Sequence, residues 1–163
     1  MLKNLFKKQE KNVDLVSPLT GNVVQLEDVP DQVFSQKMMG DGIAIEPLSN
    51  EVVSPVKGEV VDVFKTKHAI SLRTEGGAEI LIHMGLETVK LDGKGFDIKV
   101  SNGDKVEPGD HLATFDIEAV ANKNYKTITP IILLNGEDFS LSNIFTNDEA
   151  KAGKDVLFHI KEK

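Results

Sequence analysis

A nine-residue segment occurs twice in this chain and constrains the fold more than any other sequence feature. Residues 16–24, VSPLTGNVV, match residues 53–61, VSPVKGEVV, at six of nine positions and an offset of 37 residues. In each copy Pro and Gly bracket a turn, and the β-branched residues that follow favour a strand. Residues 102–110, NGDKVEPGD, are a further turn–strand–turn passage. Because the copies are too few for a solenoid, the recurrence indicates a β-sandwich built by duplication.

The other segments also predict an all-β protein. Short runs rich in Val and Ile are bounded by Gly, Pro, Asn and Asp, and residues 155–161 alternate well enough to close a sheet. Helical pattern is scarce: residues 117–123 could form one or two turns, and residues 28–36 and 139–145 could hold short 3₁₀ pieces. We expect one antiparallel β-sandwich domain over residues 15–163, preceded by a flexible tail over residues 1–14.

Composition excludes several classes of function. The 163 residues fit one domain, and the absence of Cys removes disulfides, thiolate catalysis and cysteine zinc sites. A net charge of −7 makes nucleic acid a poor partner. No apolar run reaches the roughly 18 residues of a membrane span. Leu2, Leu5 and Phe6 lie beside lysines, so weak membrane contact is an alternative to a solvated tail.

Two histidines near a predicted hairpin give the strongest functional signal. Glycines at 76–77 between strand-like runs predict a two-residue turn. That turn pairs Ile70 with His83 and His68 with Gly85, which places the two histidines on one face. Their Cβ atoms would lie roughly 7–8 Å apart. A three-residue loop would shift the pairing by one residue and place the histidines on opposite faces.

The pair suits phosphoryl transfer through a histidine. Neutral imidazole, with an ordinary pKa of about 6.5, is a good nucleophile near neutral pH. One ring, His83, could accept the phosphoryl group while the other, His68, donates a hydrogen bond to it. The Thr66 hydroxyl could fix the tautomer of His68, and the Gly85 carbonyl could hold the second ring nitrogen of His83. Apolar neighbours would keep water away, and we expect these to be Ile70, Leu81 and Met84.

The donor of the phosphoryl group is expected to be another phosphoprotein. The chain has no Gly-x-x-x-x-Gly-Lys-[Ser/Thr] loop to bind nucleotide phosphates. His111, in a Gly-Asp turn, and His159, in the terminal strand, are expected to be structural or merely exposed. A lone strand histidine is also often only a core residue, so the convergence of two of them is what favours the hypothesis.

Five passages together resemble the glucose-family IIA component of the bacterial phosphoenolpyruvate:sugar phosphotransferase system. They are residues 27–34 (EDVPDQVF), 39–45 (MGDGIAI), 64–69 (FKTKHA), 80–89 (ILIHMGLETV) and 91–96 (LDGKGF). The sequence departs from the family at Glu87, where members often carry Asp, and at Lys90, where some enteric members carry an acidic residue.

The resemblance implies a duplicated antiparallel β-sandwich, a cytoplasmic location that could include transient contact with the inner face of the membrane, and no required cofactor. It implies that the small carrier protein HPr phosphorylates His83, that His68 is the second active-site histidine and that Thr66 orients it. A Cys of a IIB domain of a sugar permease would then receive the group. It further implies a docking rim around the site, formed by Asp31, Val33, Phe34, Met39, Phe64, Met84 and Glu87.

Three other functions stay open from the residues alone. The unphosphorylated protein could bind permeases or metabolic enzymes as a regulatory module. Zinc could bind His68 and His83, as in a zinc-dependent hydrolase on a related sandwich, although a catalytic zinc normally has three protein ligands. A biotinyl or lipoyl carrier is the weakest alternative, because no Met-Lys-Met occurs and Lys123 lies in a predicted helix.

Overall fold

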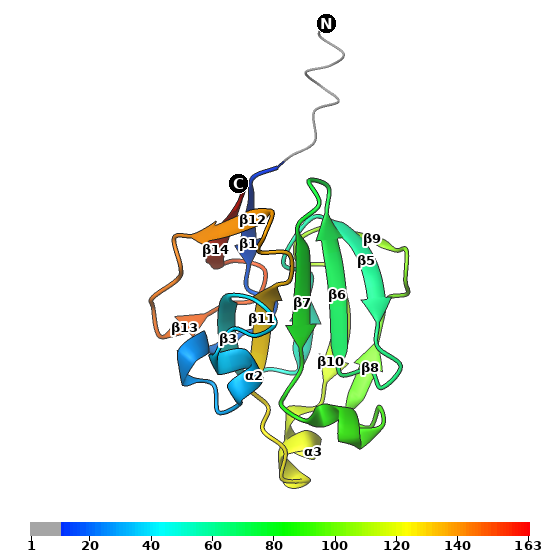
Figure 1. Ribbon diagram of the computed structural model, residues 1–163. Coiled ribbons are helices and arrows are strands. Elements are labelled where there is room, and N and C mark those ends of the chain that lie inside the picture. Colours follow the sequence, from blue (N-terminus) through cyan, green and yellow to red (C-terminus); the bar gives the residue numbers. More distant parts are fainter. Residues whose placement is uncertain (1–10) are drawn as a thin grey trace, which may run out of the picture.

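A computed structural model describes residues 11–163, in which an eight-stranded sheet packs against two three-stranded sheets around one main core (Figure 1). All strand pairs are antiparallel, so the predicted fold class is confirmed. The large sheet has the order β13 (Glu149–Ala150), β2 (Gly21–Gln25), β3 (Gly42–Pro47), β11 (Thr129–Leu133), β7 (Glu79–His83), β6 (Ala69–Thr74), β5 (Gly58–Val63), β9 (Lys105–Val106).

The two smaller sheets close the other side of the core. One has the order β1 (Val13–Val16), β14 (Val156–Glu162), β12 (Phe139–Ser142), and the other has the order β4 (Glu51–Val53), β10 (His111–Phe115), β8 (Phe96–Ile98). The helical segments are short: 3₁₀ turns η1 (Leu26–Asp28) and η2 (Thr88–Leu91), and helices α2 (Gln32–Ser35) and α3 (Ile117–Asn122).

Most of the predicted elements are present, with two corrections. Strand β14 is the middle strand of its sheet, and α3 lies where one or two helical turns were expected. In the 28–36 segment only Asp28, the end of η1, is 3₁₀, and Gln32–Ser35 form the α-helical turn α2. Residues 139–145 are not 3₁₀, because β12 begins there and pairs with β14. Val13 and Asp14, predicted to lie in the flexible tail, belong to β1 and pair with Ile160 and His159. The predicted membrane-contact segment lies outside the described residues.

The internal duplication is visible as reciprocal hydrogen bonds between the two copies of the repeat. The Val16 amide donates to the Pro55 carbonyl at 3.0 Å, and the equivalent Val53 amide donates to the Pro18 carbonyl at 2.9 Å. The buried serine of each copy donates its hydroxyl two residues forward, Ser17 to the Leu19 carbonyl at 2.6 Å and Ser54 to the Val56 carbonyl at 2.7 Å. The copies therefore build equivalent turns that hold each other in place.

The two halves of the large sheet have equivalent strand orders but differ in the length of one connection. From its centre, β11, β3, β2 and β13 run to one edge in the order in which β7, β6, β5 and β9 run to the other. Residues 64–68 join β5 to β6, whereas the equivalent connection from β2 to β3 is the longer segment 26–41. This longer segment contains η1 and α2 and covers the outer face of the sheet beside β7 and β11 (Figure 1).

Alternation along the central strands divides the side chains between two apolar clusters. Ile80 and Ile82 of β7 point into the main core, while Leu81 belongs to a second cluster on the outer face of the sheet. This outer cluster is formed by Leu26, Val29, Phe34, Ala44, Ala69, Leu81, Leu86, Ile128 and Ile132. Burial of each large side chain contributes about 1.5–3 kcal/mol, which holds segment 26–41 against the sheet.

Candidate functional site

The β6–β7 hairpin has a register one residue away from the predicted one. Ala69, not Ile70, lies opposite His83. The Thr74 amide donates to the Ala78 carbonyl at 2.9 Å, so residues 75–77 form a three-residue loop, with Gly77 at a φ of 102°. Three-residue hairpin loops commonly place a residue in the left-handed region, which Gly tolerates without a Cβ clash. The prediction of a two-residue turn is therefore wrong.

The two histidines nevertheless meet on one face, because His68 lies outside the regular strand. Strand β6 begins at Ala69, and Lys67 has a φ of 63°, so the chain turns immediately before His68. Strict alternation therefore does not extend to His68. The His68 carbonyl still accepts the Met84 amide at 2.8 Å, which keeps the end of the hairpin closed.

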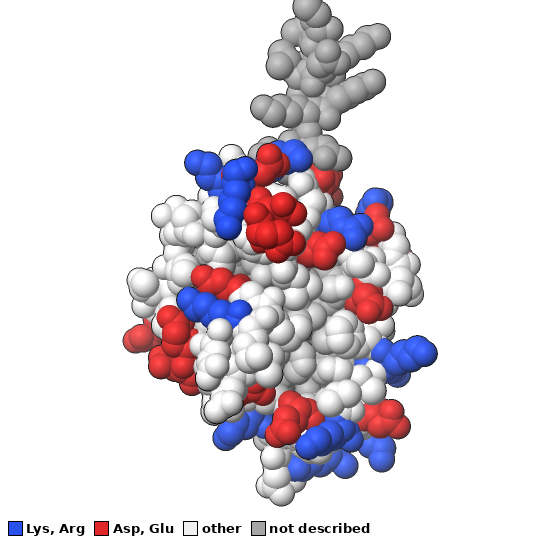
Figure 2. Space-filling model, viewed as in Figure 1, with Lys and Arg blue, Asp and Glu red and all other residues white. Residues whose placement is uncertain are grey.

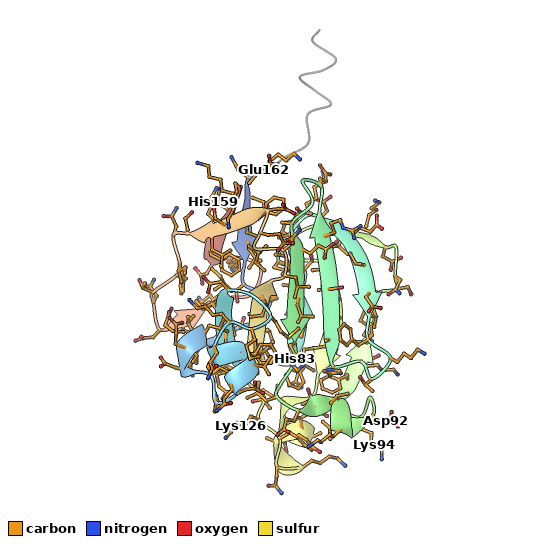
Figure 3. The ribbon with its side chains drawn as sticks, in the orientation of Figure 1. His83, Asp92, Lys94, Lys126, His159 and Glu162 are labelled. Atoms are coloured by element: carbon orange, nitrogen blue, oxygen red, sulfur yellow. The ribbon has the colours of Figure 1, made fainter. Side chains whose placement is uncertain are left out.

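The imidazole rings of His68 and His83 contact each other edge to face at the end of the hairpin. Their centroids are 4.9 Å apart and their planes are inclined by 79°. Phe34 of α2 lies 5.0 Å from the ring of His83, and Phe64 lies 5.5 Å from the ring of His68. Figure 3 shows His83 at the end of β7, at the opposite end of the molecule from His159. The predicted pair thus lies between two aromatic rings.

The hydrogen bond of His83 determines which of its nitrogens can react. Its Nδ1 lies 2.7 Å from the Gly85 carbonyl oxygen. A carbonyl can only accept a hydrogen bond, so Nδ1 of neutral His83 carries the proton and Nε2 carries the free lone pair. Phosphoryl transfer needs such a lone pair, and the predicted role of the Gly85 carbonyl agrees with this geometry.

Thr66 fixes the tautomer of His68, which is opposite to the tautomer of His83. Its Oγ1 lies 2.7 Å from Nδ1 of His68. When the hydroxyl donates to Nδ1, the proton of the His68 ring lies on Nε2 and is available for another acceptor. The two rings then offer one lone pair and one N–H group within a single small site.

Burial keeps both rings neutral at physiological pH. Burial, together with the smaller effect of the nearby His83, lowers the pKa of His68 from 6.5 to about 4. Burial also lowers the pKa of His83, whereas the Gly85 carbonyl and the Asp31 carboxylate oppose this decrease. His68 is only 4% exposed, while His83 is partly accessible.

The predicted docking residues divide between the surface and the interior. Val33 and Met39 are 41% and 39% exposed, and Glu87 is exposed and paired with Lys90 at 3.3 Å. Figure 2 shows that much of the face covered by α2 and β7 is uncharged, with charged side chains mainly at its margins. Met38 is 68% exposed and is therefore not a core residue.

The other docking residues are more buried, and one prediction is wrong. Asp31 is half-buried and caps α2, accepting the Val33 amide at 2.8 Å. Phe34 is 4% exposed and Phe64 is half-buried. Met84 is completely buried in the main core, so it cannot form part of a docking rim.

Two of the three residues predicted to exclude water point to the wrong side of the sheet. Ile70 and Met84 belong to the main core, and only Leu81 lies in the outer cluster with the site. Phe34, Phe64 and Leu86 are instead the apolar side chains associated with that outer cluster. A one-residue error of register moves every side chain of the paired strand to the opposite face, which explains Ile70. Met84 directly follows His83, so alternation alone turns it to the other face.

Sequence reasoning missed Thr88, which is completely buried beside the site. Its hydroxyl donates to the Met84 carbonyl at 2.6 Å, four residues earlier. Short-range bonds from Thr to a carbonyl four residues earlier are common, and the Met84–Thr88 spacing was the available signal.

Within residues 11–163, no group of three or more His, Cys, Asp or Glu side chains is arranged to hold a metal ion. None of the helices described there has the length and apolar character needed to cross a membrane.

The fold and site define a duplicated β-sandwich with a two-histidine centre, and sequence comparison identifies the family. Residues 13–139 match the family described as phosphoenolpyruvate-dependent sugar phosphotransferase system, EIIA 1. A protein of Oceanobacillus iheyensis, named PTS system glucose-specific EIIA component, is 47% identical over 163 residues, covering 98% of this chain and 99% of that protein. A protein of the same name from Staphylococcus epidermidis is 50% identical over 140 residues, covering 84% of each chain.

A solved structure agrees with these sequence comparisons. Glucose permease IIA from Mycoplasma capricolum superimposes with a TM-score of 0.84 and 40% identity, covering 92% of this chain and 96% of that chain. The chain belongs to the EIIA 1 family of the phosphoenolpyruvate-dependent sugar phosphotransferase system.

Proposed function

We propose that this protein is a phosphocarrier of sugar uptake that accepts a phosphoryl group from phospho-HPr on Nε2 of His83 and passes it to a Cys of a IIB domain. The supporting observation is the 2.7 Å bond from Nδ1 of His83 to the Gly85 carbonyl, which leaves the Nε2 lone pair free. Family membership supports the class of reaction, because EIIA is a component of a phosphotransferase system.

In the first step the Nε2 lone pair attacks the phosphorus atom of the donor phosphohistidine. The new N–P bond forms on His83 as the donor N–P bond breaks, and the bonding electron pair returns to the donor imidazole. Because phosphoryl transfer has a loose transition state, positioning and charge stabilisation supply most of the catalysis. Through the proton on Nδ1, the Gly85 carbonyl stabilises the positive charge that develops on the attacking His83 ring.

His68 contributes a hydrogen bond rather than a charge. Its pKa of about 4 keeps it neutral at neutral pH. With the Thr66 hydroxyl on Nδ1 at 2.7 Å, the Nε2–H group of His68 can donate to an oxygen of the transferred phosphoryl group. The contact between the two rings, at 4.9 Å between centroids, puts this donor beside His83.

The second transfer moves the group to a thiolate of the IIB domain. The thiolate attacks phosphorus, the N–P bond to His83 breaks, and the ring recovers its lone pair. Phe34 and Phe64 lie against the two histidines and limit the access of water to the intermediate. The acceptor then phosphorylates the incoming sugar, and these exchanges place the carrier in the cytoplasm, with transient visits to the inner face of the membrane.

The uncharged surface supports docking of both partners and of regulated permeases or metabolic enzymes. Val33, Met38 and Met39 supply exposed apolar and adaptable side chains next to the site. A phosphoryl group on His83 adds about two negative charges there, which favours release of partners that bind the unphosphorylated form. The proposed chemistry uses no metal, so we do not propose the zinc hydrolase alternative.

Reconstitution with radiolabelled phosphoenolpyruvate, enzyme I and HPr tests the proposal. We expect one acid-labile, base-stable label on His83, which the His83→Ala variant loses. The His68→Ala variant should accept label but transfer it poorly to a IIB domain. The His111→Ala variant, which removes an exposed imidazole of β10, is the control and should behave as wild type. An unlabelled wild-type protein, or label retained by the His83→Ala variant, would contradict the assignment.

A further inference from the structure

The Gly85 carbonyl, which orients His83, belongs to a short turn that has no regular strand partner. The turn covers residues 84–87, between the end of β7 and the start of η2. Gly85 has a φ of 80° and Glu87 a φ of 57°, so two backbone positions lie in the left-handed region. Such a turn keeps one geometry only when surrounding contacts impose it.

Two buried contacts impose that geometry. The Thr88 hydroxyl donates to the Met84 carbonyl at 2.6 Å, and Thr88 has no exposed surface. The Leu86 amide donates to the Lys126 carbonyl at 3.1 Å, and Figure 3 shows Lys126 at the same end of the molecule as His83. The first bond holds the Met84–Gly85 peptide, and the second holds the Gly85–Leu86 peptide that carries the Gly85 carbonyl, so both peptide groups that flank the Gly85 Cα are fixed.

Thr88 and Lys126 also leave no room for a side chain at Gly85. A Cβ atom at that position would lie 2.6 Å from the Thr88 Cγ2 atom and 2.7 Å from the Lys126 carbonyl oxygen. Both distances are far below normal contact, so the space around Gly85 is already filled. The Thr88 methyl group therefore fills the space beside Gly85, while the Thr88 hydroxyl holds the preceding carbonyl in place.

We propose that Thr88 is a positioning residue for the nucleophile, which fixes the Met84–Gly85 peptide so that the Gly85 carbonyl holds the proton of His83 on Nδ1. The hydrogen bond of Thr88 goes to the backbone of the turn, and Thr88 acts on His83 through this turn. Its removal would let the carbonyl rotate away, and the neutral ring could then place its proton on Nε2, the nitrogen that must attack. A misplacement of about 1 Å distant from the chemistry can reduce a rate by about a hundredfold. This inference rests on the proposed function only for its kinetic consequence.

Thr88→Val and Thr88→Ser separate the hydroxyl from the methyl group. Valine keeps the shape and loses the hydrogen bond, whereas serine keeps the hydroxyl. Thr74→Val is the matched control, because Thr74 is also buried and its Oγ1 accepts the Ala78 amide at 3.0 Å at the far end of the same hairpin. Nitrogen NMR of the imidazole rings, recorded without any phosphoryl donor, reports the tautomer of His83.

We expect the Thr88→Val variant to shift His83 from the Nδ1–H toward the Nε2–H tautomer and to accept phosphoryl groups at least about tenfold more slowly. Thr88→Ser and Thr74→Val should keep the wild-type tautomer. A folded Thr88→Val protein with the wild-type tautomer and rate would overturn the inference. If Thr88→Val does not fold, the serine variant decides, because loss of the Nδ1–H tautomer with the hydroxyl retained would also overturn it. If wild type accepts no phosphoryl group but the NMR shifts of His83 respond to the Thr88 substitutions as expected, the proposed function is refuted and the inference about Thr88 stands.

Discussion

The low pKa of His68 makes the stability of the protein depend on pH in a defined window. Burial places the pKa of folded His68 at about 4, compared with 6.5 for an ordinary histidine. Between these two pH values the unfolded chain binds a proton that folded His68 does not bind. The contribution of neutral His68 is therefore complete above pH 6.5 and is lost as the pH falls through about 4.

The size of the effect follows from the pKa difference. One pKa unit corresponds to about 1.4 kcal/mol, so the full shift is worth about 3 kcal/mol. Between pH about 7.5 and pH about 5 the linkage relation gives a loss of about 2 kcal/mol from this residue. Because His68 is only 4% exposed, solvent screening reduces this value little.

Urea unfolding of wild type and His68→Gln at pH about 7.5 and pH about 5 measures the contribution of His68 to stability. The carboxylates of the protein titrate in both forms, so the difference between the two pH-dependences isolates the histidine. On going from pH about 7.5 to pH about 5, the free energy of unfolding should decrease in both proteins. We expect the decrease in His68→Gln to be about 2 kcal/mol smaller than the decrease in wild type. His111→Gln, which removes an exposed imidazole, is the matched control. Equal losses in wild type and His68→Gln would refute the account of His68 as a ring kept neutral by burial.

Three further predictions test the surroundings of the site. Gly85→Ala should reduce the free energy of unfolding by about 2–4 kcal/mol in urea titrations, because its Cβ would overlap Thr88 and the Lys126 carbonyl at a φ of 80°; an unchanged midpoint would contradict this packing. Asp31→Asn should lower the pKa of His83 in an NMR titration, because it removes a carboxylate that raises that pKa while asparagine can still cap α2; an increase would contradict the assigned direction. A double-mutant cycle on the exposed Arg73–Glu79 pair, 3.0 Å apart, should give a coupling below about 1 kcal/mol that decreases with salt; a larger, salt-independent value would contradict this assignment.

The duplication could be predicted from the sequence because local turn chemistry repeats in both copies. Ser-Pro followed by Gly three residues later specifies a turn, and both copies form the same serine hydrogen bond. The sequence pattern did not show that segment 26–41 would cover the site of the other half. That placement depends on the long-range burial of Leu26, Val29 and Phe34 against the outer face.

The hairpin shows why the two histidines meet as predicted although the predicted register was wrong. Glycines at 76–77 suit both two-residue and three-residue loops, and the buried Thr74 hydroxyl, which accepts the Ala78 amide at 3.0 Å, accompanies the longer one. The resulting shift turns Ile70 into the core, contrary to its predicted place opposite His83. His68 still lies on the same face as His83, because Lys67 has a left-handed backbone conformation that turns the chain before β6 begins. Backbone conformations of this kind are set by tertiary context.

The central claim is that the Nε2 atom of His83 carries the phosphoryl group. Phosphorus and nitrogen NMR of protein phosphorylated through HPr, with labelled imidazole rings, locates the N–P bond directly. The 2.7 Å bond between Nδ1 and the Gly85 carbonyl predicts a phosphoryl group on Nε2 of His83, with the Nδ1 proton retained. A phosphoryl group on Nδ1 of His83, or on either nitrogen of His68, would contradict the account.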